Sequence, residues 1–400
     1  MIPAHLDVDW LSSPSLQHLF TLFETEGATL RLVGGSVRDG LLGLPVQDID
    51  LAVDRDPQWV FAFLNANQIH AIPTGIEHGT ITAVIDHKPY QITTLRVDVK
   101  TFGRRAEVAF TEDWTQDAQR RDFTINAIYA DKEGILFDPV GGLEDLKNHI
   151  VKFIGDPNLR IQEDYLRILR FFRFSARFGS APYDQAGLEA CQRYASEMHI
   201  LARERITEEF LKILGLPNLL SILQAMEASG VLAHITRPPT SWRTLAALLT
   251  LEEGRINPLL RLAALQPNFA EISARLRLSN DQTRVLAFLG EDPPLITLSS
   301  LKSQAYRQGR DAVMDLALLQ TAQRVGQGDI TEEEGVQLLK SFYTLEDLPP
   351  FPLTGEDVLA HGVLKGPQVG HTLKQVEDWW LDQDLQPDRA ACLAYLATLL

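Results

Sequence analysis

Two aspartates separated by one residue, Asp48 and Asp50, carry the clearest chemical signal in the chain. Residues 48–53 begin as an alternation of polar and apolar side chains, which predicts a strand with both carboxylates on one face. Adjacent carboxylates repel each other unless a cation lies between them, and oxygen ligands of this kind suit Mg²⁺ better than a softer metal. The pattern therefore predicts a metal site at Asp48 and Asp50.

A glycine turn lies upstream of this pair. The apolar residues 32–33 predict a short buried strand, and Gly34, Gly35 and Ser36 predict a tight turn with bare backbone N–H groups that opens a helix. These N–H groups and the positive end of the helix dipole favour an anion, and Arg38 falls in the first helical turn. Either feature alone is usually structural, but together they indicate a site that handles a nucleotide phosphate.

A stripe of charged residues within residues 161–178 is the third chemical pattern. Steps of three and then four place these residues along one side of a predicted helix, with apolar residues mainly on the other side. The stripe comprises Asp164, Arg167, Arg170, Arg173 and Arg177. Because arginines this close together repel unless phosphates or carboxylates face them, the stripe predicts an anion-binding surface. The alternative is a solvated amphipathic helix.

The composition limits the class of protein. With 400 residues, 45% of them hydrophobic, the chain is long enough for two or more domains with their own cores. Its net charge of −16 argues against a general nucleic-acid binder, so an RNA substrate requires a local basic patch. The candidate patches are Arg104 with Arg105, Arg120 with Arg121, and the arginines of residues 160–177.

The cysteines and the termini favour a cytoplasmic protein without membrane contact. Cys191 and Cys392 provide neither a disulfide framework nor a CxxC metal site, which is typical of a reducing compartment. The first residues lack a basic stretch before an apolar run, and no window is apolar over the length of a bilayer span.

The elements that must position the charged residues follow from periodicity and turn signals. Residues 13–14, Ser-Pro, predict the start of an N-terminal helix, and residues 57–65 predict a second helix. Residues 73–86 and 90–97 predict a pair of strands. This combination indicates a small mixed sheet with helices around the glycine turn and the aspartate pair.

The remaining chain divides into a loop and a long helical part. Residues 98–119 have mixed charges and no clean period, which predicts a mobile loop. From Arg203 onward the pattern is almost wholly helical, with prolines between the helices. Trp379 and Trp380 are expected in a core and not as an RNA stacking platform.

Three motifs resemble those of class II nucleotidyltransferases, the family that comprises tRNA CCA-adding enzymes and bacterial poly(A) polymerases. They are GGxVRDxLLGxPxxDxD at residues 34–50, RRDFTxNA at residues 120–127 and EDxxRxxRxxRF at residues 163–174. Gln91 stands where this family often has a glutamate, and Asp98 is the alternative third acid. The resemblance covers the first 240 residues motif by motif and the tail more loosely.

The resemblance implies an α+β protein: an N-terminal nucleotidyltransferase head with a mixed β-sheet and helices, followed by an all-α neck, body and tail. We expect the catalytic head at residues 1–138, a helical neck with a nucleotide-selecting helix at 139–240, and an all-α, tRNA-binding body and tail at 241–400. The implied activity is template-independent addition of CCA to the 3′ end of tRNA from CTP and ATP, releasing pyrophosphate.

The resemblance also implies roles for residues. Asp48 and Asp50 would be catalytic and hold Mg²⁺, with two ions assisting an in-line displacement. The triphosphate-binding residues would be Gly34, Gly35, Ser36 and Arg38. The nucleotide pocket would be completed by Arg121, Asp164, Arg167, Arg170 and Arg173.

Asp164 and Arg167 could select the base without a nucleic-acid template. Cytosine and adenine each present an amino donor beside an unprotonated ring nitrogen, whereas uracil and guanine present a carbonyl beside an N–H. A carboxylate only accepts hydrogen bonds and a guanidinium only donates them. This pair would therefore fit C and A and reject U and G, and we expect one i, i+3 step of a helix to bring both to the base.

Other functions share part of this pattern. A poly(A) polymerase, or a split enzyme that adds only CC or only A, would carry the same head motifs, but the acidic balance and the lack of a basic C-terminal extension count against the polymerase. A remote alternative is an inactive RNA-binding relative. That alternative predicts loss of Asp48 or Asp50, and both are present.

Overall fold

A computed structural model describes residues 5–102, 105–236, 240–290, 295–343 and 348–400, with their side chains except those of residues 98–107. The chain divides into two compact units, Met1–Ile235 and Thr236–Leu400. The predicted motifs all lie in the first unit. Each unit is described below by itself.

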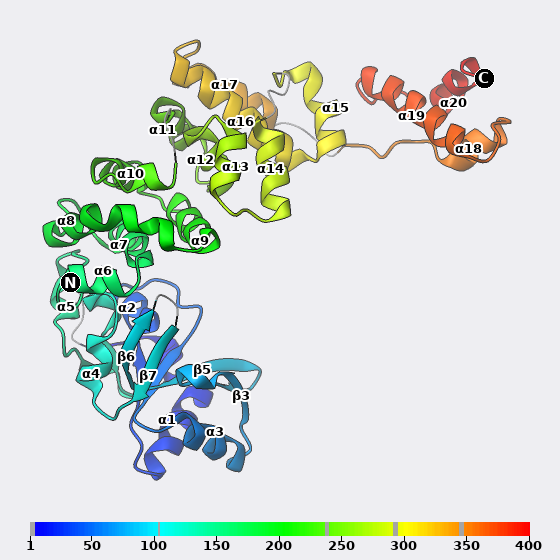
Figure 1. Ribbon diagram of the computed structural model, residues 1–400. Coiled ribbons are helices and arrows are strands. Elements are labelled where there is room, and N and C mark those ends of the chain that lie inside the picture. The colour runs from blue at the N-terminus through cyan, green and yellow to red at the C-terminus, as the bar shows by residue number, and fades with distance from the viewer. Residues whose placement is uncertain (1–4, 103–104, 237–239, 291–294, 344–347) are drawn as a thin grey trace. The chain divides into compact units, whose positions relative to one another are not determined.

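A seven-stranded mixed sheet forms the N-terminal part of the first unit, in the order β3-β4-β5-β2-β1-β8-β9 (Figure 1). The strands are β1 (Leu30–Val33), β2 (Asp50–Val53), β3 (His70–Gly75), β4 (Thr80–Ile85), β5 (Lys88–Thr94), β8 (Tyr129–Ala130) and β9 (Leu136–Phe137). β2 pairs with β5 in parallel, and the other neighbours pair in antiparallel. The predicted mixed sheet is therefore confirmed.

Helices α1 (Pro14–Thr25) and α3 (Pro57–Ala66) pack side by side near the sheet (Figure 1). Each begins with proline at its first position, as the sequence predicts, because the missing N–H of proline costs nothing there. Phe23 of α1 makes edge-on contacts with Trp59 and Phe63 of α3, with ring centroids 6.1 and 5.2 Å apart. These aromatic contacts hold the two helices together.

Two sequence predictions for residues 70–119 are wrong. Residues 73–86 do not form a single strand, because β3 and β4 are separated by a short 3₁₀ helix at Ile76–His78 and Gly79 at a φ of +83°. The predicted mobile loop instead contains β6 (Arg96–Phe102) and β7 (Arg105–Phe110), which pair in a two-stranded antiparallel sheet, followed by α4. The structure of this segment depends on pairing between two strands, which the local pattern of charges does not reveal. Arg104 and the side chains of Asp98 and Arg105 lie outside the described residues.

The remaining α-helices of the first unit lie between strands or follow the last strand (Figure 1). They are α2 (Gly35–Leu41), α4 (Trp114–Gln119), α5 (Gly142–Lys147), α6 (Pro157–Glu163), α7 (Leu166–Phe178), α8 (Gln185–Tyr194), α9 (Arg203–Leu214) and α10 (Leu219–Ala228). α7 packs against α9 and α10, and α6 packs against α8. Buried aromatic rings connect α7 to the segment before β8. The ring centroids of Phe171 and Phe174 lie 6.4 and 5.2 Å from that of Phe123.

The second unit is all-α within its described residues. Its helices are α11 (Trp242–Leu251), α12 (Pro258–Leu265), α13 (Phe269–Arg275), α14 (Asn280–Gly290), α15 (Leu298–Gln308), α16 (Arg310–Gln327), α17 (Glu332–Tyr343), α18 (Gly355–Ala360), α19 (Pro367–Asp382) and α20 (Arg389–Thr398). The expected helical body and tail are confirmed. None of the helices in the described part of the chain has the length and apolar character needed to cross a membrane.

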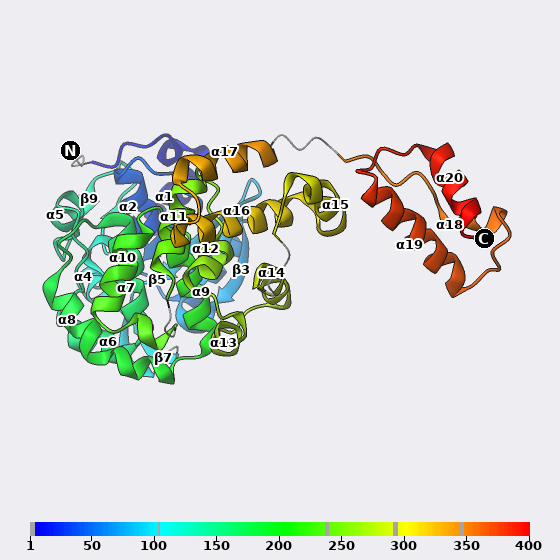
Figure 2. The same ribbon diagram turned by 90° about the horizontal axis from the view of Figure 1, so that it is seen from above.

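The last three helices, α18, α19 and α20, gather around a core of their own (Figure 2). Trp380 is only 1% exposed, donates its indole N–H to the Pro387 carbonyl at 3.0 Å and contacts the rings of Tyr306 and Phe351. Trp379 stacks on Tyr395 with ring centroids 4.3 Å apart. The prediction that this tryptophan pair belongs to a core is therefore confirmed.

Candidate active site

The glycine turn leads from β1 into α2, as the sequence predicts. Gly34 has a φ of +71° and a ψ of −125°, a conformation that only glycine adopts without strain. A methyl group added to Gly34 would lie 3.6 Å from Nη1 of Arg121. The Ser36 hydroxyl donates to the Val33 carbonyl at 3.2 Å, so this side chain closes the turn. Glycine at position 34 thus lets the chain turn sharply beside an arginine.

Arg38 is buried beneath the turn. Its guanidinium donates to Asp39 through Nε at 2.8 Å and also contacts the amide oxygen of Asn126. The ring centroid of Phe178 lies 4.1 Å from the guanidinium carbon. Burial lowers the pKa of Arg38, although Asp39 opposes this shift. Arg38 therefore braces α2 against the segment that contains Asn126 and against α7.

Asp48 and Asp50 line one cavity of about 440 Å³, together with Gly35, Ser36 and Arg177. The strand begins at Asp50 and not at Asp48 as predicted. Asp50 is therefore the first residue of β2, and Asp48 lies in the loop before it. Burial raises the pKa of Asp50, Arg121 opposes this shift, and the nearby charge of Asp48 adds to it. The two carboxylates are therefore close enough to repel each other.

Gln91 occupies the position beside Asp50 on the neighbouring strand. The two residues are direct partners in the parallel pairing of β2 with β5, and Gln91 is exposed. Among the side chains that the structure describes, no group of three or more histidine, cysteine, aspartate or glutamate residues is arranged to hold a metal ion. Gln91 thus places an amide, and not a third carboxylate, beside Asp50.

Asp117, at the centre of a buried ion cluster, holds two arginines of the RRDFTxNA motif. Its Oδ1 accepts from Nε and Nη2 of Arg120 at 2.8 and 2.7 Å, and its Oδ2 accepts from Nε and Nη2 of Arg121 at 3.2 and 3.0 Å. The Tyr129 hydroxyl also donates to Oδ2, at 2.8 Å. Burial alone would raise the pKa of Asp117, but Arg121 and Arg120 lower it to about 2.

Asp122 holds a different arginine from the one expected. The adjacent Arg121 is held by Asp117, whereas Asp122 accepts from Nε of Arg170 in α7, at 2.8 Å, and from the Asn126 amide at 3.0 Å. Burial alone would raise the pKa of Asp122, but Arg170 and the hydrogen bond from Asn126 lower it. This ion pair joins the RRDFTxNA segment to the helix that carries the arginine stripe.

The predicted single helix over residues 161–178 is interrupted at Asp164. α6 ends at Glu163, Asp164 has an extended backbone with φ −156° and ψ 107°, and α7 begins at Leu166. The expectation that Asp164 and Arg167 are one i, i+3 step apart on a helix is therefore wrong. Asp164 accepts two hydrogen bonds from Arg205 of α9, at 3.1 and 2.7 Å.

Every arginine of the stripe faces a carboxylate. Arg167 pairs with Glu163, Arg170 with Asp122, Arg173 with Glu209 of α9 at 2.5 Å, and Arg177 with Asp39 at 3.2 Å. The opposite side of α7 is buried, as predicted: Leu169, Phe172 and Ala176 are 0%, 0% and 3% exposed. The carboxylates offset the repulsion between the arginines and fix their side chains.

A second cavity, of about 510 Å³, adjoins the acidic one and shares Gly35 and Asp50 with it. It is lined by Gly34, Gly35, Arg38, Asp50, Arg96, Arg120, Arg121, Asp122, Asn126, Asp164, Arg167, Arg170, Arg173 and Phe174. Seven of these residues are arginines and three are aspartates. Every residue to which the sequence analysis gave a catalytic, metal-binding or nucleotide-binding role lines one or both of these cavities. A local basic pocket thus exists in a chain of net charge −16.

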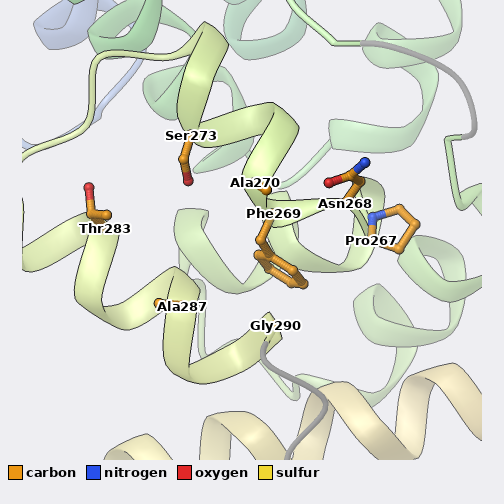
Figure 3. A pocket seen from close by; sticks show the side chains of 8 residues that line it. All are labelled: Pro267, Asn268, Phe269, Ala270, Ser273, Thr283, Ala287 and Gly290. Carbon is orange, nitrogen blue, oxygen red and sulfur yellow. The ribbon is translucent and has the colours of Figure 1, made fainter.

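A cavity of about 690 Å³ in the second unit has a different character (Figure 3). It is lined by Pro267, Asn268, Phe269, Ala270, Ser273, Thr283, Ala287 and Gly290. The Phe269 ring lies against Gly290, where an added Cβ would fall 1.8 Å from a ring carbon. None of the described residues that line this cavity is charged, in contrast to those of the basic cavity in the first unit.

Comparisons with known proteins agree with this geometry. Residues 30–152 match the family model of the poly A polymerase head domain, and residues 184–241 match that of the probable RNA and SrmB-binding site of polymerase A. The mitochondrial CCA tRNA nucleotidyltransferase 1 of Homo sapiens is 33% identical over 407 residues, covering 96% of this chain and 92% of that protein. The CCA-adding enzyme of Limosilactobacillus fermentum is 30% identical over 399 residues, covering 92% and 93%.

The chain belongs to the CCA tRNA nucleotidyltransferase family. Solved structures of CCA-adding enzymes share its fold. The Bacillus stearothermophilus enzyme in complex with CTP has a TM-score of 0.71 at 24% identity, covering 97% of this chain and 98% of its own. The Thermotoga maritima enzyme complexed with tRNA has a TM-score of 0.64 at 20% identity, covering 100% of both chains.

In this member of the CCA tRNA nucleotidyltransferase family, the sequence did not predict the residues that hold the arginines and Asp164 in place. Glu163, Arg205 and Glu209 hold residues of the arginine stripe, and Asp117 holds Arg120 and Arg121. Arg205 and Glu209 stand four apart in residues 203–210, a spacing that places them on one face of α9. This spacing was a usable signal, but nothing local says which partner that face meets.

Proposed function

We propose that this chain adds C, C and A to the 3′ end of tRNA from CTP and ATP without a nucleic-acid template. The observation that carries the proposal is the pair of adjoining cavities that share Gly35 and Asp50, one lined by Asp39, Asp48 and Asp50 and the other by seven arginines. A carboxylate pair beside a basic pocket suits transfer of a nucleotidyl group from a triphosphate to a hydroxyl. Membership of the CCA tRNA nucleotidyltransferase family supports tRNA as the acceptor.

In this reaction the 3′-hydroxyl oxygen of the tRNA bonds to the α-phosphorus, the bond to pyrophosphate breaks, and the hydroxyl loses its proton. Gly34, Gly35, Ser36 and Arg38 form the triphosphate-binding turn, in which backbone N–H groups meet the anion and buried Arg38 fixes α2. Arg121 adds its guanidinium beside Gly34. Arg170 and Arg173 extend the basic wall from α7.

The divalent cation that such transfer requires fits Asp48 and Asp50, and we propose Mg²⁺. The two carboxylates line one cavity, and the raised pKa of Asp50 reflects burial and the charge of Asp48, both of which a cation would offset. Mg²⁺ commonly uses one or two protein carboxylates and completes its shell with water and substrate phosphates. When bound, it would lower the pKa of the attacking hydroxyl and offset charge on the leaving pyrophosphate.

Selection of C and A is assigned to Asp164 and Arg167. Both line the basic cavity although they do not share a helix. Arg205 forms an ion pair with the Asp164 carboxylate and Glu163 forms one with Arg167, so both side chains are held in place. An acceptor and a donor of fixed kind match the edges of cytosine and adenine and oppose those of uracil and guanine.

We further propose that residues 1–138 form the catalytic head, 139–240 the neck, and 241–400 the tRNA-binding body and tail. The sheet ends with β9 at Phe137, and the chain is helical afterwards, which supports the first boundary. The cytoplasm is the proposed compartment because Cys191 and Cys392 are both free thiols. The family includes mitochondrial and bacterial proteins, so localisation of a tagged chain decides this point.

One assay tests the function. The purified chain is incubated with tRNA that lacks its 3′ CCA, with all four nucleotides together and with CTP or ATP alone, and the products are sequenced. We expect CCA with the complete mixture and CC with CTP alone. Addition that stops at CC, or of A only, would identify a split enzyme, and a long A tract would identify a poly(A) polymerase.

A further inference from the structure

We propose that Asp117 is a positioning residue that sets Arg120 and Arg121 for binding the nucleotide triphosphate. Asp117 does not line the basic cavity, whereas both arginines do. It therefore acts through them and not by contact with the nucleotide. The proposal rests on the proposed function for the identity of the ligand.

Each carboxylate oxygen of Asp117 binds one of the two arginines. Oδ1 receives Nε and Nη2 of Arg120, and the backbone N–H of Arg96 donates to the same oxygen at 3.3 Å. Oδ2 receives Nε and Nη2 of Arg121 together with the Tyr129 hydroxyl. Each guanidinium is thus gripped along one edge, which fixes the direction of its plane.

The Nη1 atom of Arg121 lies beside the glycine turn. A guanidinium has five N–H donors, and Asp117 engages those of Nε and Nη2. Nη1 is the atom that would lie 3.6 Å from a Cβ on Gly34, at the turn assigned to the triphosphate. Because Asp117 binds one edge of the Arg121 guanidinium, the other edge can donate to phosphate oxygens. Backbone position is fixed separately, because Arg160 donates to the carbonyl of Arg121 at 2.6 Å.

The cluster is built to stay charged. The Asp117 side chain is 1% exposed, and its pKa is lowered to about 2 by Arg121 and Arg120 against the opposing effect of burial. A charge buried this deeply must be paired and hydrogen-bonded, and Asp117 is both. Losing the charge would leave two neighbouring arginines facing each other, so their side chains would separate.

The test compares Asp117→Asn with the wild type. We expect the KM for CTP and ATP, and the dissociation constant for CTP measured by titration calorimetry, to rise about tenfold, which corresponds to about 1.4 kcal/mol, while kcat changes much less. Asp131→Asn is the matched control. Asp131 lies in the same unit, accepts from two backbone N–H groups of the β8–β9 turn and lines neither cavity, so the KM of this variant should stay at the wild-type value.

A combined variant separates positioning from a general structural role. If Asp117 acts through Arg120 and Arg121, then adding Asp117→Asn to a variant that already carries Arg120→Met and Arg121→Met should raise KM little beyond the value of that variant. Multiplying effects, or a lowered melting temperature with an unchanged KM in Asp117→Asn, would overturn the proposal. If Asp117→Asn does not fold, Asp117→Glu replaces it, because this variant keeps the charge but displaces both arginines. A wild-type KM in that variant would also overturn the proposal.

The design distinguishes this inference from the proposed function. A wild type that binds CTP but extends no tRNA contradicts the function, while the CTP affinities of the variants still decide the role of Asp117. A wild type that extends tRNA with an Asp117→Asn variant of unchanged CTP affinity contradicts only the positioning role.

Discussion

Asp50 is the residue at which the acidic and the basic cavity meet. Its neighbours explain its importance: Asp48 shares the acidic cavity, and the charge of Arg121 reaches it from the basic side. A carboxylate between the proposed cation site and the proposed triphosphate site would serve both parts of a nucleotidyl transfer. Substitution here should therefore affect chemistry more than folding.

We expect Asp48→Asn and Asp50→Asn each to lower kcat by at least about 100-fold, about 2.7 kcal/mol, because each removes a charged metal ligand without removing volume. Steady-state addition to tRNA that lacks its 3′ CCA measures this effect, and thermal unfolding checks the fold. Asp54→Asn is the control, since Asp54 lies just beyond β2 and accepts from the Thr29 N–H. Near-normal turnover in either active-site variant would rule out the metal assignment.

Asp164 is predicted to restrict the choice of nucleotide. Asp164→Asn turns a pure acceptor into a group that also donates, so use of CTP and ATP should weaken and the gap to UTP and GTP should narrow. A good bidentate match is worth about 1–3 kcal/mol, which corresponds to about 5- to 150-fold. Incorporation of all four nucleotides measures it, with Asp184→Asn, an N-cap of α8, as the control. An unchanged ranking and spread would place selection elsewhere in the pocket.

The Asp117 cluster predicts a pH dependence of stability. The pKa of Asp117 falls from 3.8 to about 2 on folding, so its contribution of about 2 kcal/mol is complete well above pH 3.8 and is lost as the pH falls towards 2. The difference in unfolding free energy between the wild type and Asp117→Asn, measured from pH 7 to pH 3, should therefore become smaller as the pH falls. A difference that stays constant with pH would contradict this.

At the scale of single elements, two short breaks in regular structure create the site. One is the turn at Gly34 between β1 and α2, and the other is the extended residue Asp164 between α6 and α7. Both Gly34 and Asp164 line the basic cavity. The helices and strands on either side are ordinary, and their function is to hold these breaks rigidly.

Gly34→Ala should destabilise the fold by about 1–3 kcal/mol, because alanine is strained at a φ of +71° with a ψ of −125°. It should also raise the KM for CTP, because the added methyl group lies between the turn and Arg121. Gly328→Ala is the control: Gly328 has a φ of +84° in the second unit with open space around it, so that variant should lose stability alone. Equal KM values in the two variants would show that the turn does not contact the nucleotide.

At the scale of the whole molecule, charge is distributed unevenly. The chain has 53 acidic and 37 basic residues, yet seven of its arginines line a single cavity. Four arginines of the stripe on α7 are paired with carboxylates, so incoming phosphates exchange partners with carboxylates instead of meeting bare cations. This arrangement limits non-specific attraction to RNA while keeping the arginines in position.

The tail core should be separable from nucleotide binding. Trp380→Ala removes the largest fully buried side chain and should cost about 3–5 kcal/mol of the stability of the tail core. CTP affinity should remain at the wild-type value, because the basic cavity lies wholly within the first unit. Trp379→Ala, at a half-buried position beside it, should cost less. Denaturant unfolding and calorimetry measure the two quantities, and a parallel loss of CTP affinity would contradict their independence.

The sequence by itself determined the features that depend on neighbours within a few residues. Residues 32–50 predicted the buried strand, the glycine turn, the helix after it and the aspartate pair, because each depends on local backbone preference and short spacing. The starts of α1 and α3 and the buried side of α7 followed for the same reason. The helical second unit followed from periodicity.

The tertiary structure alone decided how these pieces meet. Three ion pairs join residues that are far apart in the sequence. Arg170 binds Asp122, 48 positions away, Arg173 binds Glu209, 36 positions away, and Arg205 binds Asp164, 41 positions away. It also decided that residues 96–110 pair as β6 and β7. Local patterns fix which side of an element is charged, but the partner depends on how separate elements pack their apolar faces together. The stripe could therefore be predicted from sequence, whereas the carboxylates that hold it could not.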